Sequence, residues 1–324
     1  MILVTGGAGY IGSHYVMQAI EAGESVVVLD NLAYGHREAV VDGAELIVGD
    51  MSDRGLLDQI FSQHRIDAVV HFAAFAYVGE SVTAPRKYYL NNTVATLNVL
   101  NAMVDHGVLK FVFSSTCATY GNPQYMPIDE KHPQSPINPY GESKFFVEKM
   151  LQAYNNAYGL RFCALRYFNA AGADPEGKIG ESHDPETHLI PLVLQTATGQ
   201  RDTISIFGTD YDTPDGTCIR DYIHILDLAR AHGLSLKRLR DGAESGFFNL
   251  GTETGISVTE VIETCRRITG KPIPTLFKDR RPGDPARLVA SATKARTELG
   301  WEPQFADLDS IVRTAWTWEQ NRRY

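Results

Sequence analysis

Short, wholly apolar runs alternate with helix-like segments through the first half of the chain, and this rhythm narrows the possible folds most. The runs are ILV, SVVVLD, ELIVGD, DAVVHFA, KFVFSS and RFCALR. Between them, apolar residues recur at helical spacing over residues 11–22, 53–64, 85–106 and 140–158. Strands that are apolar throughout are covered on both faces, so their alternation with helices predicts a doubly wound parallel sheet of the Rossmann type.

The alternation of strands and helices ends after Arg166. The stretch YFNAAGADPEGKIGESHDPETHLIP is rich in Gly, Pro and Asp and predicts a long irregular segment. Beyond it, ISIFG, DYIHI and FFNLG mix with helical patterns near residues 226–239 and 258–268 and a final helix that ends in TAWTWEQ. We therefore predict an α/β chain with a first domain over residues 1–168 and a smaller α/β domain over 169–324, with some chain crossing back.

Charge and cysteine usage exclude several partner classes. The formal net charge of −9 over 324 residues argues against nucleic acid or an anionic membrane as a partner. Cys117, Cys163, Cys218 and Cys265 are scattered, with no pair at zinc or redox spacing. The sequence opens directly on a strand and has no apolar run of membrane-spanning length, so we expect no signal peptide and a cytoplasmic protein.

The glycine-rich stretch VTGGAGYIGSH lies between the first strand and the first helix. Gly6, Gly9 and Gly12 carry no Cβ, so a phosphate can approach the backbone and the free N–H groups of the helix start. Such a turn alone is a weak signal, because it also serves plain connections. Its strand–turn–helix context favours a dinucleotide site.

Two acidic residues extend this interpretation. Asp30 ends the second strand, where a carboxylate can bind the adenosine ribose hydroxyls and repel a ribose phosphate. NAD is therefore favoured over NADP, although Arg37 leaves the phosphorylated cofactor open. Asp50 follows the third strand and fits an adenine contact, but on its own it also fits an ordinary turn.

A tyrosine and a lysine continue the apolar face of the helix over residues 140–158. Tyr140 and Lys144 stand one turn apart, on the face that Val147 and Tyr158 also mark. A phenol has a pKa of about 10, which a nearby ammonium and a cationic nicotinamide would lower, making Tyr140 a proton acceptor. The alternative is that Tyr140 only packs and Lys144 reaches outward.

The stretch FSSTCATYG favours the chemical interpretation. It follows the fifth strand, at the edge where doubly wound sheets bind ligands, and Ser114, Ser115 and Thr116 offer hydroxyls there to orient a substrate oxygen. A glycine loop, a strand-end hydroxyl and Tyr-x-x-x-Lys in this order predict that Tyr140 takes a proton while NAD takes a hydride.

These motifs resemble the extended short-chain dehydrogenase/reductase family and, within it, the UDP-glucose 4-epimerases. The resemblance runs from end to end through GGAGYIGSH, DNL, HFAA, VGESV, YYLNN, SSTCATYG, PYGESK, LRYFNAAGA, FGTDYDTPDGTCIRDYIHILDLA and RRPGD. It implies an NAD-dependent isomerase that interconverts UDP-galactose and UDP-glucose. Tyr140 removes the 4-hydroxyl proton, hydride leaves carbon four, and the ketose rotates before hydride returns. Thr116 binds the same oxygen, and Lys144 holds the nicotinamide ribose.

The resemblance also assigns the two domains, to NAD and to the UDP-sugar, and their binding residues. The NAD site comprises Gly6, Gly9, Tyr10, Ile11, Gly12, Asp30, Asn31, Leu32, Gly35, Asp50, Met51, Phe72, Ala73, Ala74, Ala76, Asn91, Ser114, Tyr140, Lys144 and Phe168. The UDP-sugar site comprises Thr116, Tyr140, Asn169, His188, Leu189, Phe207, Arg220, Arg281, Asp284 and Leu288. The planar guanidinium groups of Arg220 and Arg281 are expected to donate hydrogen bonds to the diphosphate. No metal is expected.

Some positions depart from the family pattern. Ala76 stands where some members carry a lysine near the NAD phosphates, and His188 stands where others carry an asparagine near the substrate phosphates. Thr116 replaces a serine but keeps the hydroxyl. Leu288, of intermediate size, favours sugars without an N-acetyl group.

Other functions of this superfamily stay open or are excluded. Cys117 and Ala118 stand where the 4,6-dehydratases carry an Asp-Glu pair, which excludes elimination. A non-catalytic NAD sensor is disfavoured by the intact Tyr140 and Lys144. A UDP-xylose/UDP-arabinose or UDP-glucuronate 4-epimerase of the same mechanism remains open. The resemblance also implies a homodimer through residues 85–106 and 140–158.

Overall fold

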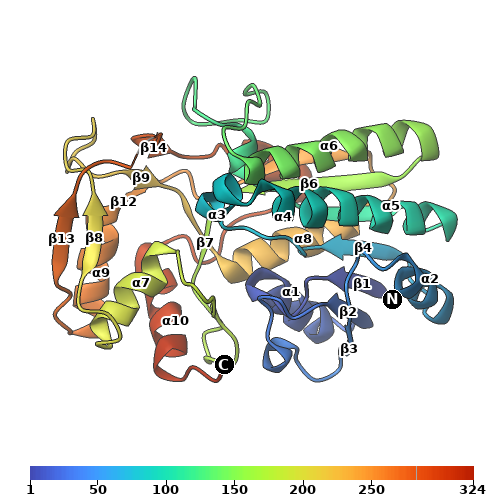
Figure 1. The fold of residues 1–324 in the computed structure, drawn as a ribbon, viewed down its shortest axis with the longest axis horizontal. Coiled ribbons are helices and arrows are strands. Elements are labelled where there is room, and N and C mark those ends of the chain that lie inside the picture. Colours follow the sequence, from blue (N-terminus) through green and yellow to red (C-terminus); the bar gives the residue numbers. More distant parts are fainter. Residues whose placement is uncertain (282) are drawn as a thin grey trace.

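The computed structural model describes residues 1–281 and 283–324 (Figure 1). Its centre is a seven-stranded sheet with the strand order β11-β6-β5-β4-β1-β2-β3, in which every neighbouring pair is parallel. The predicted doubly wound parallel sheet is confirmed. The strands are β1 (Ile2–Thr5), β2 (Val26–Asp30), β3 (Glu45–Val48), β4 (Ala68–His71), β5 (Lys110–Ser114), β6 (Arg161–Tyr167) and β11 (Gly246–Leu250).

Successive strand residues face opposite layers of helices, as period-two geometry requires. Ile2 and Val4 pack with α1 (Tyr10–Glu21) and α8 (Ile225–Arg240). Leu3 packs on the other side. The helices there are α2 (Arg54–Gln63), α5 (Thr96–Asp105) and α6 (Pro139–Tyr158). The sheet is therefore buried on both faces, which explains why its strands are apolar throughout.

The helix predicted over residues 85–106 is interrupted. It consists of α4 (Pro85–Tyr88), a π-helical segment over Tyr89–Ala95 and α5. The wider turn places Asn92 under the loop after β4, where its side chain accepts a hydrogen bond from the Phe75 N–H and donates one to the Phe75 carbonyl, both at 2.9 Å. Such π segments recur at functional sites.

Two smaller differences concern neighbouring helices. The short helix α3 (Val78–Thr83) was not predicted. Tyr158, predicted on the buried face of α6, is 54% exposed, because the helix ends there and Gly159, with a φ of 71°, turns the chain toward β6.

The later half of the chain builds small sheets beside the large one. These are β7 (Asn169–Ala171) with β10 (Tyr222–His224), β8 (Ile204–Phe207) with β13 (Thr275–Lys278), and β9 (Ile219–Arg220) between β12 (Ile256–Ser257) and β14 (Arg287–Leu288). A separate apolar core joins α7 (Leu189–Ala197), α9 (Val258–Thr269) and α10 (Leu308–Gln320). Short helical turns cover Arg37–Ala39, Cys117–Thr119 and Ala295–Leu299.

The chain crosses back to the large sheet before it ends. The helix α8 packs on the sheet with α1, and β11 forms its outer edge beside β6 (Figure 1). Both come from the later half of the sequence, so the division at residue 168 stays a prediction about domains. Within the part of the chain that the structure describes, no helix is long and apolar enough to cross a membrane.

Leu165 tests the central packing. Its side chain is fully buried in β6, so we expect Leu165→Ala to lower the free energy of unfolding by about 2–5 kcal/mol. Urea unfolding followed by circular dichroism measures this. Leu276→Ala, at a position 48% exposed on β13, is the control and should change stability by less than about 0.5 kcal/mol. Equal losses in both variants would contradict the assignment.

Candidate active site

The predicted site residues gather at the carboxyl edge of the large sheet. The glycine loop follows β1, Asp30 ends β2, residues 72–76 follow β4, Ser114 ends β5, and residues 115–116 follow it. Open parallel sheets bind ligands at this edge.

The glycines of the first loop divide into two kinds. A Cβ on Gly6 would lie 2.4 Å from the Ala73 nitrogen, and one on Gly12 would lie 2.1 Å from the Gly6 oxygen, so the turn itself requires both. A Cβ on Gly9 would meet only the Gly6 oxygen at 3.5 Å. No side chain caps α1 at Gly9. The space above Gly9 and the uncapped helix start therefore form a cradle for a phosphate group.

Asp30 is held in place by two backbone donors. Its side chain accepts hydrogen bonds from the Ala8 N–H at 2.9 Å and the Leu32 N–H at 2.8 Å. Burial raises its pKa, and these two bonds oppose the shift. A carboxylate fixed at a strand end, with lone pairs left over, suits the ribose hydroxyls of NAD.

Neighbouring predicted contacts surround Asp30. Asn31 donates a hydrogen bond to the Asp50 carboxylate at 2.8 Å, which brings the ends of β2 and β3 together. A Cβ on Gly35 would lie 3.0 Å from an Asp30 carboxylate oxygen. Met51, which follows Asp50 directly in the sequence, is buried. These four residues thus lie around one point of the sheet edge, as the sequence predicts.

The loop after β4 is fixed from both sides. The N–H groups of Phe72 and Ala73 donate to the Thr5 carbonyl at 2.8 and 3.0 Å. Asn91 donates to the Asn92 side chain at 3.0 Å, and Asn92 holds Phe75. Ala74 is half-buried and Ala76 is exposed. The loop backbone therefore lies beside Gly6, in the cradle.

Tyr140 and Lys144 both point inward, with residue exposures of 9% and 4%. Lys144 donates a hydrogen bond from Nζ to the Ser114 carbonyl at 2.9 Å, and its ammonium lies 4.9 Å from the Phe113 ring centre. Burial lowers the pKa of Lys144 to about 7. The alternative of an outward-reaching lysine is therefore wrong.

The acidity of Tyr140 differs from the expectation. Burial raises the pKa of Tyr140 to about 12, and the Thr116 hydroxyl lowers it only in part. Lys144 does not offset the burial effect in the chain alone. A further positive charge beside the phenol, such as a nicotinamide ring, is needed to favour the phenolate.

The strand-end hydroxyls have different partners. Ser114 Oγ lies 2.5 Å from the Tyr167 hydroxyl, and Ser115 donates to Glu148 at 2.6 Å. Ser115 is therefore turned away from the edge, and its predicted role in orienting substrate is wrong. Thr116 Oγ1 accepts a weak bond from the Ala118 N–H at 3.2 Å and can still donate its proton. Among the three, Thr116 remains the hydroxyl beside Tyr140.

A buried ion pair behind this edge was not predicted. Arg166 donates to both oxygens of Glu148, at 2.9 and 2.7 Å, and to the Tyr120 hydroxyl at 2.9 Å. Tyr120 in turn donates to Asn249 at 2.6 Å. The only sign of this pair in the sequence is Glu148, which lies eight residues after Tyr140 on the same helical face. Arg166 shows no such sign, because it lies within a predicted strand.

The predicted sugar-nucleotide residues form a second group. Arg220 is hydrogen-bonded to Asp284 and donates to the Pro285 carbonyl at 2.9 Å. Strand pairing sets Leu288 opposite Arg220. Arg281 lies over the Phe207 ring at 4.0 Å. The structure thus pairs Arg220 with Asp284 and Arg281 with Phe207.

This group approaches Thr116 through a small apolar cluster. Leu288 and Cys117 pack against Phe168 and Tyr120. Burial raises the pKa of the Cys117 thiol to about 12. The positive charge of Arg220 opposes this shift, so Arg220 lies near Cys117. Arg220 and the catalytic candidates therefore share one neighbourhood.

Two other predicted substrate residues have protein partners. Asn169 donates to the Asp221 carbonyl at 3.0 Å. His188, just before Leu189 at the start of α7, is hydrogen-bonded to Glu181. The sequence did not single out Glu181.

A model of the NAD dependent epimerase/dehydratase family matches residues 2–251. The chain belongs to this family. It is 57% identical over 319 residues to the UDP-glucose 4-epimerase of Halalkalibacterium halodurans, covering 98% of this chain and 95% of that protein. A crystal structure of UDP-glucose 4-epimerase matches with a TM-score of 0.98 and 52% identity, covering 99% of this chain and 98% of the other. The Brucella ovis enzyme in complex with NAD matches with a TM-score of 0.95 and 48% identity over 97% of each chain.

Family membership and the local chemistry agree on the cofactor. The open space above Gly9 fits a diphosphate, and the fixed carboxylate of Asp30 fits unphosphorylated ribose hydroxyls. The buried Lys144 lies at the same edge and can donate to the second ribose. The residues present therefore fit NAD, and the predicted resemblance to this family is confirmed.

The buried ammonium of Lys144 predicts a pH-dependent stability in the protein without NAD. The pKa of Lys144 is lowered from 10.5 to about 7, so the unfolded chain binds the extra proton between these pH values. Stability therefore rises with pH across this window. We expect Lys144→Met to be more stable than wild type near pH 7. Its advantage should shrink by up to about 1.4 kcal/mol per pH unit as the pH rises.

Urea unfolding between about pH 6.5 and 9.5, a range that covers most of this window, measures the difference. The control is Lys149→Met, on the exposed face of the same helix, whose curve should run parallel to that of wild type. Parallel curves for Lys144→Met as well would show that Lys144 keeps an ordinary pKa.

Proposed function

We propose that this chain is a UDP-glucose 4-epimerase that interconverts UDP-galactose and UDP-glucose. The observation that carries the proposal is the buried Tyr140–Lys144 pair beside Thr116 at the carboxyl edge of the sheet. The relatives named UDP-glucose 4-epimerase extend over nearly the whole chain, so they support both the cofactor-binding and the sugar-binding parts.

Each residue at the edge has a distinct task. Thr116 donates a hydrogen bond to the sugar 4-oxygen, and Tyr140 takes the 4-hydroxyl proton. NAD, when bound, accepts the hydride from carbon four and returns it. Lys144 holds the nicotinamide ribose and supplies positive charge near the phenol. The 4-ketose rotates in the site, so that its other face receives the hydride, and Tyr140 returns the proton to the oxygen. Carbon four then has the opposite configuration.

Charge explains how an acidic protein binds a diphosphate. Arg220 and Arg281 offer planar donors, and these residues hold the diphosphate of the UDP-sugar in the proposal. In the structure Arg220 is paired with Asp284, so the substrate exchanges one anionic partner for another. Phe207 supports Arg281, and Asn169 and Leu189 lie at the two ends of the irregular segment. Leu288 borders the sugar.

The alternatives differ in chemistry or in sugar. A sensor needs no proton acceptor, yet Tyr140 is buried beside a Thr116 hydroxyl that can still donate its proton. A UDP-xylose/UDP-arabinose or UDP-glucuronate 4-epimerase uses the same residues, because the sugars differ only at carbon five. Substrate comparison therefore separates hexose from pentose.

The test supplies UDP-galactose and, separately, UDP-xylose to the purified protein and follows the 4-epimers by NMR. We expect conversion of UDP-galactose without added NAD, and a loss of kcat of at least about 100-fold in Tyr140→Phe, because the proton acceptor is gone. The control Tyr154→Phe, on the same helix away from the sheet edge, keeps kcat within about twofold.

The results divide clearly. Conversion of the pentose alone would keep the mechanism and change the substrate. No conversion of either sugar, with NAD added, would overturn the epimerase proposal. A fully active Tyr140→Phe would overturn the role of Tyr140.

We further propose a homodimer formed through α5, α6 and the π-helical segment. Leu90, Val94 and Phe146 are large apolar side chains that are 52%, 47% and 45% exposed. The Tyr89 and Phe146 rings lie 6.1 Å apart, so the two segments form one surface (Figure 1). A second copy would cover this surface.

A cytoplasmic location stays part of the proposal.

Light scattering after size-exclusion chromatography tests the dimer. Leu90→Asp with Phe146→Asp places charges on the surface and should convert a species of twice the chain mass to one of single mass. Phe277→Asp, at an equally apolar position 64% exposed on β13, should leave the dimer intact. A wild-type chain of single mass at micromolar concentration would overturn the proposal.

A further inference from the structure

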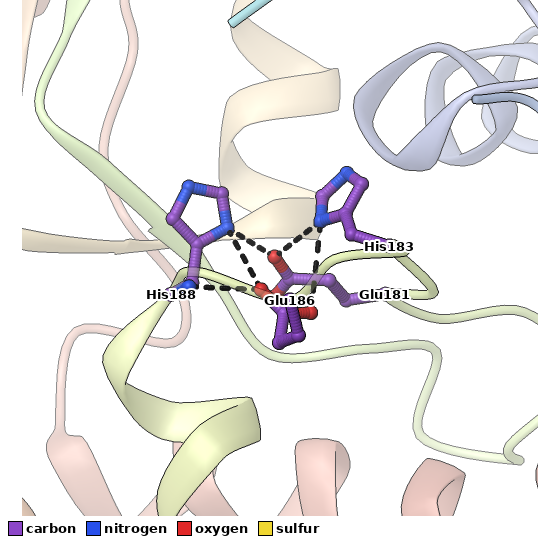
Figure 2. Close-up of side chains that lie close together, drawn as sticks. All are labelled: Glu181, His183, Glu186 and His188. Atoms are coloured by element: carbon purple, nitrogen blue, oxygen red, sulfur yellow. Dashed lines mark hydrogen bonds and ion pairs between the residues drawn. The ribbon is translucent and has the colours of Figure 1, made fainter. Parts of the chain in front are cut away.

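Four side chains converge in the irregular segment before α7. The proposed reaction does not require them as a group. Glu181, His183, Glu186 and His188 each offer a donor atom, and these atoms all lie within 4.8 Å of one another. Figure 2 shows both imidazole rings turning Nδ1 toward the same two carboxylates. This residue set combines the nitrogen and oxygen ligands typical of transition-metal sites.

Three separations between the donor atoms are close to those found around one small ion. His183 Nδ1 lies 3.1 Å from Glu181 Oε1 and 3.7 Å from Glu186 Oε2. His188 Nδ1 is hydrogen-bonded to Glu181 and lies 3.8 Å from Glu186 Oε1. In a tetrahedral zinc site with bonds of about 2.0–2.2 Å, neighbouring ligand atoms are about 3.3–3.6 Å apart. Small adjustments therefore suffice to admit an ion.

One donor in the cluster has no hydrogen bond. His183 Nδ1 is buried and makes no hydrogen bond, although it lies within ion-pair distance of the Glu181 and Glu186 carboxylates. Buried polar atoms nearly always have partners, so this atom calls for an explanation. A metal ion between the ring and the carboxylates would supply the missing partner.

The surroundings hold the ligands in place. The side chains of Glu181 and Glu186 are each only 5% exposed. Trp318 donates from its indole nitrogen to the Glu181 carbonyl at 2.8 Å. The backbone N–H groups of Thr187 and His188 donate to Glu186 at 2.7 and 2.8 Å. Such outer contacts orient metal ligands.

We propose that Glu181, His183, Glu186 and His188 bind one divalent transition-metal ion, best matched by Zn²⁺. Binding of the ion releases the imidazole protons to solvent, and two neutral imidazoles with two carboxylates then balance the charge of a divalent ion. Mg²⁺ and Ca²⁺ prefer oxygen ligands alone, so the two imidazoles select against them. Four protein ligands close the coordination shell, which makes the ion structural.

The ion would fasten the irregular segment to the start of α7. His183 lies edge-on to Tyr10 at 6.1 Å, so this fastening reaches the first turn of α1. His188 binds through Nδ1, and its half-exposed ring leaves Nε2 for another partner. The proposal does not depend on the epimerase function, because its readout is metal content and stability.

The test uses the full chain without an affinity tag, freed of metal by a chelator. After ZnCl₂ is added and excess removed, elemental analysis should find one zinc per chain, and zinc should raise the Tm. Glu181→Gln with His183→Gln keeps side-chain size and should weaken zinc binding at least about 100-fold in a chelator competition. His106→Gln, in the surface pair with Asp58 at 3.0 Å, should keep full binding.

Circular dichroism confirms that the variants are folded. Folded wild type that takes up no zinc would overturn the proposal, as would full zinc binding by the double variant. An equal rise in Tm with MgCl₂ would overturn the choice of a transition metal. Anomalous scattering at the zinc edge, located between His183 and His188, would support the proposal directly.

Discussion

A parallel sheet covered on both faces leaves its carboxyl edge as the place where polar groups can collect. Strands β1, β2, β4 and β5 all end there, and each is followed by a loop that carries candidate site residues. Glycine at position 6 lets the loops after β1 and β4 touch at backbone distance, and glycine at position 12 lets α1 start close to its own loop. The positions of the glycine-rich loop, the Asp30 carboxylate and the Tyr140 helix are thus consequences of one topology.

Burial at this edge sets the chemistry as much as the residue types do. The pKa of Lys144 falls and that of Tyr140 rises because neither charged form is well solvated. The protein therefore holds a neutral phenol until a positively charged ring lies beside it. Behind it, the ion pair of Glu148 with Arg166 joins α6 to β6, and each guanidinium nitrogen of Arg166 donates a hydrogen bond. This pair holds the Tyr140 helix against the sheet.

The sequence predicted those features that repeat locally. Apolar periodicity located the strands of the first half, and the Tyr140–Lys144 spacing predicted two inward side chains. The π-helical segment escaped prediction because it depends on the contact of Asn92 with Phe75. The return of β11 depends on pairing between distant residues, and no local pattern encodes it. Glu181 and His183 lie in a segment without periodicity, so only their convergence in space reveals them.

The outer strand β11 has a consequence for how the chain can be divided. It covers β6 and comes from residues 246–250, well after the small sheets have begun. A fragment that stops at residue 168 would leave the N–H and C=O groups of β6 as an open edge, and it would also lack α8 over one face of the sheet. Such an edge invites pairing between molecules. The cofactor-binding half is therefore not a separable module, and cutting the chain there should yield aggregates rather than a smaller NAD-binding protein.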